Sequence, residues 1–126
     1  MEDDNQLARC IVDAAVEVHR ALGPGLLESV YRRCLVKELG LRGIRVAEEV
    51  PLRAEYKGLV FDSAYRMDLL VEGRIVVELK TVEALQPVHP AQLLSYLRLS
   101  GRRLGLLLNF NVPLMKNGIK RIINSY

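Results

Sequence analysis

Apolar residues recur at helical spacing in the first third of the chain. They fall three or four positions apart, as on one face of a helix, and Gly23-Pro24 separates two such segments. Each segment is long enough for several helical turns, so we predict two consecutive helices. The first begins at Asp4 or Asn5, either of which can cap it, and ends at about Leu22, and the second begins within residues 25–31 and ends at Leu39 or Gly40.

The remaining residues predict strands and one further helix. Pro51 interrupts the first extended stretch, which favours a bent or edge strand. The apolar stretch 104–110 is unbroken, which is typical of a strand covered on both faces. The predicted elements are strands 44–56, 60–71 and 74–82, a helix at 90–100, and strands 104–110 and 119–124. The order ααβββαββ predicts an α/β sandwich with a central mixed β-sheet flanked by helices, in a single domain spanning residues 1–126.

Composition limits the class of protein but does not indicate a specific function. With 126 residues, 50% of them hydrophobic, the chain can bury a core without disulfides, and Cys10 and Cys34 lie in apolar helical contexts typical of reduced cysteines. The acidic N-terminus is not followed by a long apolar segment, so we expect neither a signal peptide nor a membrane helix, and a cytoplasmic protein. The 18 basic and 15 acidic residues give a net charge of +3, which permits a nucleic-acid partner without requiring one.

Three charged residues interrupt the predicted hairpin 60–82, where burial is expected. Asp68 stands alone among apolar residues, and Glu78 and Lys80 follow an apolar triplet two positions apart, so they share a face of their strand. A buried charge is costly unless it is paired or holds a metal ion. Two carboxylates and an ammonium across adjacent strands therefore indicate a metal site. No P-loop, Rossmann glycine pattern, zinc spacing or serine–histidine–aspartate arrangement is present.

The pattern Asp68, ten residues, Glu78-x-Lys80 resembles the active-site signature of the PD-(D/E)XK nuclease superfamily. Gly25-x-x-Glu28-x-x-Tyr31 is the motif that names the GxxExxY family, which is assigned to that superfamily. The resemblance extends over nearly the whole chain, although Met67 stands where the superfamily name has proline. It implies a restriction-endonuclease-like fold. From spacing alone, the favoured interpretation of Glu28 is an acidic residue that complements the dipole in the first turn of a helix.

The resemblance also implies the chemistry of the site. It implies Mg²⁺ or Mn²⁺ as cofactor, held by Asp68, Glu78, the Leu79 backbone carbonyl and Glu28, with Lys80 beside the attacking water. Glu28, Asp68, Glu78 and Lys80 would then be the catalytic residues of a metal-dependent nuclease acting on DNA.

Four further residues are supporting candidates. Gln92 and Tyr96 resemble the Gln-x-x-x-Tyr element that follows the Glu-x-Lys strand in exonucleases of recombination and repair, although a surface glutamine and a core-edge tyrosine are common on any helix. Tyr31 belongs to the Gly-x-x-Glu-x-x-Tyr motif. His19 precedes the carboxylates, as a histidine does in some nucleases of the superfamily, but a satisfied structural histidine is the simpler interpretation.

Two classes of function remain open on the sequence. The first is the nuclease, in repair or defence. The second is a non-catalytic accessory module that keeps the fold and uses its basic residues to bind nucleic acid. In either case the chain has little beyond the core with which to recognise a substrate, so a homo-oligomer or protein partner is a further expectation, and the strands near Ile44 or Ile119 offer edges for it.

Overall fold

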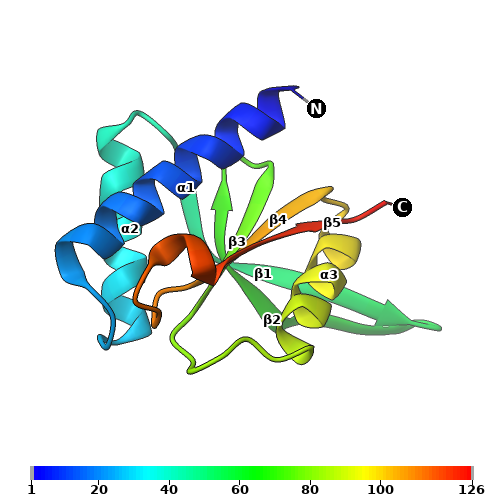
Figure 1. Cartoon of the computed structure of the whole chain (residues 1–126). Helices are drawn as coiled ribbons and strands as arrows, with labels where there is room; N and C mark the ends of the chain where they lie inside the picture. Colours follow the sequence, from blue (N-terminus) through cyan, green and yellow to red (C-terminus); the bar gives the residue numbers. More distant parts are fainter. Residues whose placement is uncertain (1, 126) are drawn as a thin grey trace.

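The fold is a five-stranded mixed sheet with helices on both faces (Figure 1), described by the computed structural model for residues 2–125. The sheet order is β1-β2-β3-β4-β5, and only the β3–β4 pair is parallel. The elements in chain order are α1 (Glu2–Leu22), α2 (Glu28–Leu41), β1 (Val46–Tyr56), β2 (Leu59–Val71), β3 (Ile75–Lys80), α3 (Val88–Ser100), β4 (Leu104–Asn109), a 3₁₀ turn η1 (Met115–Gly118) and β5 (Ile119–Ile123). This architecture confirms the predicted α/β class, element order and restriction-endonuclease-like fold. Among the described helices, none is both long and apolar enough to cross a membrane.

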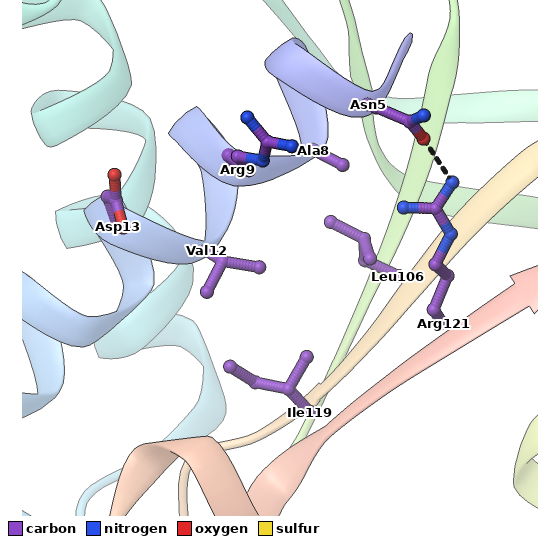
Figure 2. Close-up of a pocket in the computed structure, with 8 residues that line it drawn as sticks. All are labelled: Asn5, Ala8, Arg9, Val12, Asp13, Leu106, Ile119 and Arg121. Carbon is purple, nitrogen blue, oxygen red and sulfur yellow. Dashed lines mark hydrogen bonds between the residues drawn. The ribbon is translucent and has the colours of Figure 1, made fainter. Parts of the chain in front are cut away.

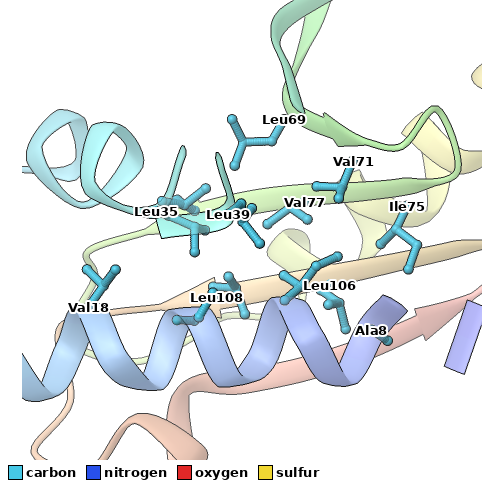
Figure 3. Close-up of a cluster of buried hydrophobic side chains, with 14 of the residues drawn as sticks. Ala8, Val18, Leu35, Leu39, Leu69, Val71, Ile75, Val77, Leu106 and Leu108 are labelled. Carbon is cyan, nitrogen blue, oxygen red and sulfur yellow. The ribbon is translucent and has the colours of Figure 1, made fainter. Parts of the chain in front are cut away.

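Two hydrophobic clusters fill the space on either side of the sheet. Helices α1 and α2 cover one face, where Figure 3 shows Leu106 and Leu108 of β4 near Ala8 and Val18 of α1. Helix α3 covers the other face, and its Leu93 packs in a separate cluster. Strands β3 and β4 contribute residues to both clusters. This burial on both faces explains why their sequences are almost continuously apolar.

Several boundaries differ from those predicted. Helix α1 begins at Glu2, so the prediction that Asp4 or Asn5 caps it is wrong. Both lie in its first turn, where Asp4 lies 3.4 Å from the Arg74 guanidinium and Asn5 accepts a hydrogen bond from Arg121. Strand β3 ends at Lys80 rather than at Val82, and α3 begins at Val88. Strand β1 lies at an edge of the sheet, which confirms the interpretation of Pro51.

The inward alternation of side chains breaks partway along the first two strands. Val46 and Val71 are paired and pack with the α1–α2 cluster, whereas Val50 and Met67 are also paired and pack with the α3 cluster. In an undisturbed strand, positions 46 and 50 would face the same way, as would 67 and 71. Glu49 has φ 48°, an uncommon conformation for a residue with a side chain, and it lies where β1 changes face. The hairpin thus changes face around Glu49 and Asp68.

Two glycines provide a test of the packing between β4 and η1. A Cβ on Gly118 would lie 2.1 Å from the Asn109 backbone oxygen, whereas one on helical Gly40 would meet nothing within 4 Å. We predict that Gly118→Ala lowers the free energy of unfolding by about 1–3 kcal/mol or more, and that Gly40→Ala raises it by up to about 1 kcal/mol. Urea denaturation of both variants measures this. Equal stability of the two variants would contradict the described packing.

Candidate active site

Strands β2 and β3 pair only at the hairpin end. Their register joins Val71 to Ile75 and ends at Leu69–Val77, while β3 remains paired with β4 as far as Lys80–Asn109. Continued pairing would place Asp68 opposite Glu78. The two strands instead part at this point, and their carboxylates occupy the gap.

The two carboxylates replace the missing ladder hydrogen bonds. Glu78 Oε2 accepts a hydrogen bond from the Asp68 backbone N–H at 2.7 Å, and Asp68 Oδ2 accepts one from the Leu79 N–H at 2.9 Å. Among the described residues, neither carboxylate makes another side-chain hydrogen bond, so one oxygen of each remains available. The N–H and C=O of one strand residue point to the same edge, so the Leu79 carbonyl also faces the gap.

Burial and mutual repulsion make this arrangement costly while both carboxylates are charged. Glu78 is 4% exposed, and burial, followed by the charge of Asp68, raises its pKa to about 8. Burial also raises the pKa of Asp68, against the hydrogen bond from Leu79 and the charge of Lys80. At neutral pH the pair therefore favours a bound proton or a nearby cation.

Lys80 is the cation that the strand itself provides. Its charge lowers the pKa values of Glu28, Asp68 and Glu78, which places it within reach of all three carboxylates. Its Nζ donates a long hydrogen bond, 3.5 Å, to Oε1 of Gln92 on α3. Gln92 thus contacts the ammonium from α3.

Glu28 reaches the same site from α2. It is the first residue of that helix, and burial and the charge of Asp68 both raise its pKa. The fully buried Tyr31 fixes the preceding loop, because its hydroxyl donates to the Gly23 carbonyl at 2.5 Å and accepts from the Leu26 N–H at 3.1 Å. Gly25 has φ 94°, a conformation that favours glycine. The spacing of Gly25, Glu28 and Tyr31 therefore has a structural basis, because Tyr31 fixes the loop that precedes Glu28 at the start of α2.

The two histidines of the chain, His19 and His89, form hydrogen bonds with backbone groups. His19 is buried, with Nε2 2.7 Å from the Val112 carbonyl, and its ring lies 6.5 Å from that of Phe110. The Tyr31 ring stacks on Phe110 as well, with 4.6 Å between the two ring centroids. His89 Nδ1 accepts a hydrogen bond from the Gln86 N–H ahead of α3. These contacts tie loops to helices and do not bring either histidine to the carboxylates.

The structure adds three residues that sequence reasoning did not place at this site. Arg32 and Glu49 are joined by a 3.9 Å ion pair, and both influence the pKa of Asp68, with opposite signs. Arg32 Nε is buried without a hydrogen-bond partner in the described part of the chain. The side chain of Asn109, which is 2% exposed, accepts a hydrogen bond from the Val82 N–H and donates one to the Val82 carbonyl. These two bonds fix the chain just after Lys80. Only Asn109 carried a sequence signal, as a polar residue ending an apolar strand.

The donor set fits a hard divalent cation that keeps several waters. Across residues 2–125, no three His, Cys, Asp or Glu side chains group closely enough to hold a metal unaided. Asp68 and Glu78 instead offer two carboxylate oxygens beside the Leu79 carbonyl, which suits Mg²⁺ or Mn²⁺ better than zinc. Within residues 2–125, the four carboxylates of Glu28, Glu49, Asp68 and Glu78 are accompanied by two cations, Lys80 and Arg32, so the site carries a net negative charge while all four are ionised.

A separate hollow of about 610 Å³ lies between α1 and strands β4 and β5 (Figure 2). Arg9, Asp13 and Arg121 are its charged lining residues, and Arg121 also donates a hydrogen bond to Asn5. None of the candidate catalytic residues lines it. It lies on the α1 side of the sheet, whereas Lys80 contacts Gln92 on the α3 side.

Comparison with known protein families gives a match over most of the chain. The family model described as the PD-(D/E)XK nuclease superfamily matches residues 5–122, which include every candidate site residue. No curated protein and no solved structure matches the chain.

The raised pKa of Glu78 predicts an unusual pH dependence of stability in the absence of metal. Between about pH 4.5 and 8 the folded protein keeps a proton on Glu78 that the unfolded chain releases, so stability falls as pH rises, by up to about 1.4 kcal/mol per pH unit. Urea denaturation at pH 5, 6.5 and 8 in EDTA measures this fall. Glu78→Gln, which cannot ionise, should flatten it, whereas the exposed control Glu83→Gln should not. A Glu78→Gln profile that parallels the wild type would show that Glu78 ionises normally.

Proposed function

Because the chain belongs to the PD-(D/E)XK nuclease superfamily, we propose that it is a divalent-metal-dependent nuclease that hydrolyses DNA phosphodiester bonds. One observation carries the proposal. Asp68, Glu78 and Lys80 meet where β2 and β3 part, and each carboxylate accepts a hydrogen bond from a backbone N–H of the opposite strand, Glu78 from Asp68 and Asp68 from Leu79. The Gly25-x-x-Glu28-x-x-Tyr31 motif further supports membership of the GxxExxY family.

Asp68, Glu78 and the Leu79 carbonyl are the proposed ligands of Mg²⁺ or Mn²⁺, with Glu28 next to them. When bound, the ion would supply Lewis-acid stabilisation of the negative charge on the phosphate and its leaving oxygen. The backbone hydrogen bonds to Asp68 and Glu78 hold the two carboxylates in place before substrate arrives, so little reorganisation is required on binding.

Lys80 would orient the attacking water and stabilise the charge that develops on phosphorus. An ammonium aimed at developing charge in a partly buried site is worth more than one in water. Gln92 would keep this ammonium in position through its hydrogen bond to Nζ, and Asn109 would do so from the other side by fixing the end of β3. Tyr31 acts through the loop it fixes, as a positioning residue for Glu28.

The Gln92–Tyr96 pair supports an exonuclease-like enzyme of recombination, repair or defence. The two residues lie one helical turn apart on α3, and Tyr96 is buried beside the site, where burial and the charges of Glu78 and Asp68 raise its pKa. The open edges of β1 and β5 suit a second copy or a protein partner that extends the grip on DNA.

Cleavage of labelled linear and circular DNA with Mg²⁺ or Mn²⁺ tests the proposal. We predict metal-dependent cleavage by the wild type, reduced at least about 100-fold by Lys80→Ala because the charge on the transition state loses its ammonium. Lys116→Ala, which removes an exposed lysine of η1, is the matched control and should cleave like the wild type. Cleavage confined to linear DNA would identify an exonuclease.

The opposite result has a clear meaning. A folded wild type that binds metal but cleaves neither DNA nor RNA would contradict the proposed function, and would favour an accessory module that keeps the nuclease fold.

A further inference from the structure

A groove of about 550 Å³ adjoins the candidate active site on the α3 side of the sheet. Its lining comes from α3 and from the part of the β1–β2 hairpin that extends beyond the β2–β3 pairing. These two elements lie near each other in the fold (Figure 1). Tyr65 lines it from β2, and Gln92, Ser95, Tyr96 and Arg98 line it from α3. Its size is within the usual range for small-ligand sites.

The groove is continuous with the site through two residues. Gln92 accepts the hydrogen bond from Lys80 and also lines the groove. Tyr96 lines it too, and the carboxylates of Glu78 and Asp68 help to raise the pKa of its hydroxyl, which places that hydroxyl near both. A strand whose phosphate lay at Lys80 would therefore have its neighbouring nucleotide at the groove.

The walls of the groove suit a flat aromatic ligand. The Tyr65 and Tyr96 rings are 6.1 Å apart between centroids and inclined at 48°, so they form a wedge. Tyr96 is mostly buried, whereas Tyr65 is 49% exposed and offers a ring face that the fold does not cover. Val88, 65% exposed, extends the apolar surface at the start of α3.

Polar groups occur beside this apolar surface. Gln92 and Ser95 provide donors and acceptors for the edge of a base, and the Lys80 ammonium lies next to Gln92. This combination favours a ligand that has an aromatic ring with polar edges and a negative charge next to it. A nucleotide has both, and its base face is accessible only when the base is unpaired and unstacked.

We propose that this groove binds an unpaired nucleobase next to the phosphate that is cleaved, with the base stacked on Tyr65. The proposal rests on the proposed nuclease function and specifies its substrate as a strand that is single-stranded at or beside the cleaved bond. DNA and RNA share this chemistry, and the experiment separates them.

The chain has no tryptophan, so a single introduced indole reports on stacking directly. We would place Tyr65→Trp, and separately Tyr56→Trp as a matched control, in the otherwise unchanged chain in EDTA, which withholds the metal so that no strand is cut while Lys80 stays in place. Tyr56 lies on the same hairpin at its tip, is 66% exposed and does not line the groove. Each variant would be titrated with a single-stranded oligodeoxynucleotide, the matching oligoribonucleotide and a blunt duplex.

We expect single strands to quench the tryptophan at position 65 and not at position 56, with little quenching by the duplex. Tyr65→Ala should weaken single-strand binding about tenfold in fluorescence anisotropy, whereas Tyr65→Phe should retain it and Tyr56→Ala should have no effect. Comparison of the two oligonucleotides shows which sugar is preferred.

Three results would overturn the proposal: no quenching at position 65, equal quenching at both positions, or unchanged affinity of a folded Tyr65→Ala variant. These readouts do not need catalysis. Quenching in EDTA together with no cleavage by the wild type in Mg²⁺ or Mn²⁺ would support the groove and refute the nuclease, whereas cleavage in Mg²⁺ or Mn²⁺ without quenching in EDTA would do the reverse.

Discussion

The parting of β2 and β3 at Asp68 and Glu78 is the constraint on which the site depends. Regular pairing would set two carboxylates opposite each other in a buried sheet, where both cannot remain charged at low cost. The strands instead separate, and each carboxylate accepts a backbone N–H that the ladder would otherwise have used. These two hydrogen bonds satisfy the backbone N–H groups of Asp68 and Leu79 and leave one oxygen of each carboxylate for a ligand. The Leu79 carbonyl also faces the gap.

The rest of the fold holds this opening in place. Parallel pairing with β4 keeps β3 straight to Lys80, and Asn109 fixes the chain beyond it. Helix α2 approaches from the face that it shares with α1 and delivers Glu28, after a loop fixed by Tyr31. Helix α3 covers the opposite face and delivers Gln92. Both layers of the sandwich thus contribute to one site at the place where the hairpin changes face.

The sequence predicted the element order, the edge position of β1 and the meeting of Asp68 with Glu78, because side-chain periodicity and the spacing of charges are local signals. It did not predict that the strands part, because this depends on the cost of burying two carboxylates in a complete sheet. Nor did it predict the change of face near Glu49, where a residue with a side chain adopts φ 48° without the glycine that usually signals it. The partnership of Arg32 with Glu49 joins α2 to β1, and such long-range contacts leave no pattern along the chain.

Calorimetric titration with Mn²⁺ shows whether the Asp68–Glu78 pair binds a divalent cation, as we propose. We predict binding by the wild type, loss of binding in a folded Asp68→Asn variant, and wild-type binding by Asp62→Asn, whose exposed carboxylate lies on the same strand. A wild type that binds no Mn²⁺, or an Asp68→Asn variant that binds it equally well, would contradict the proposed metal site.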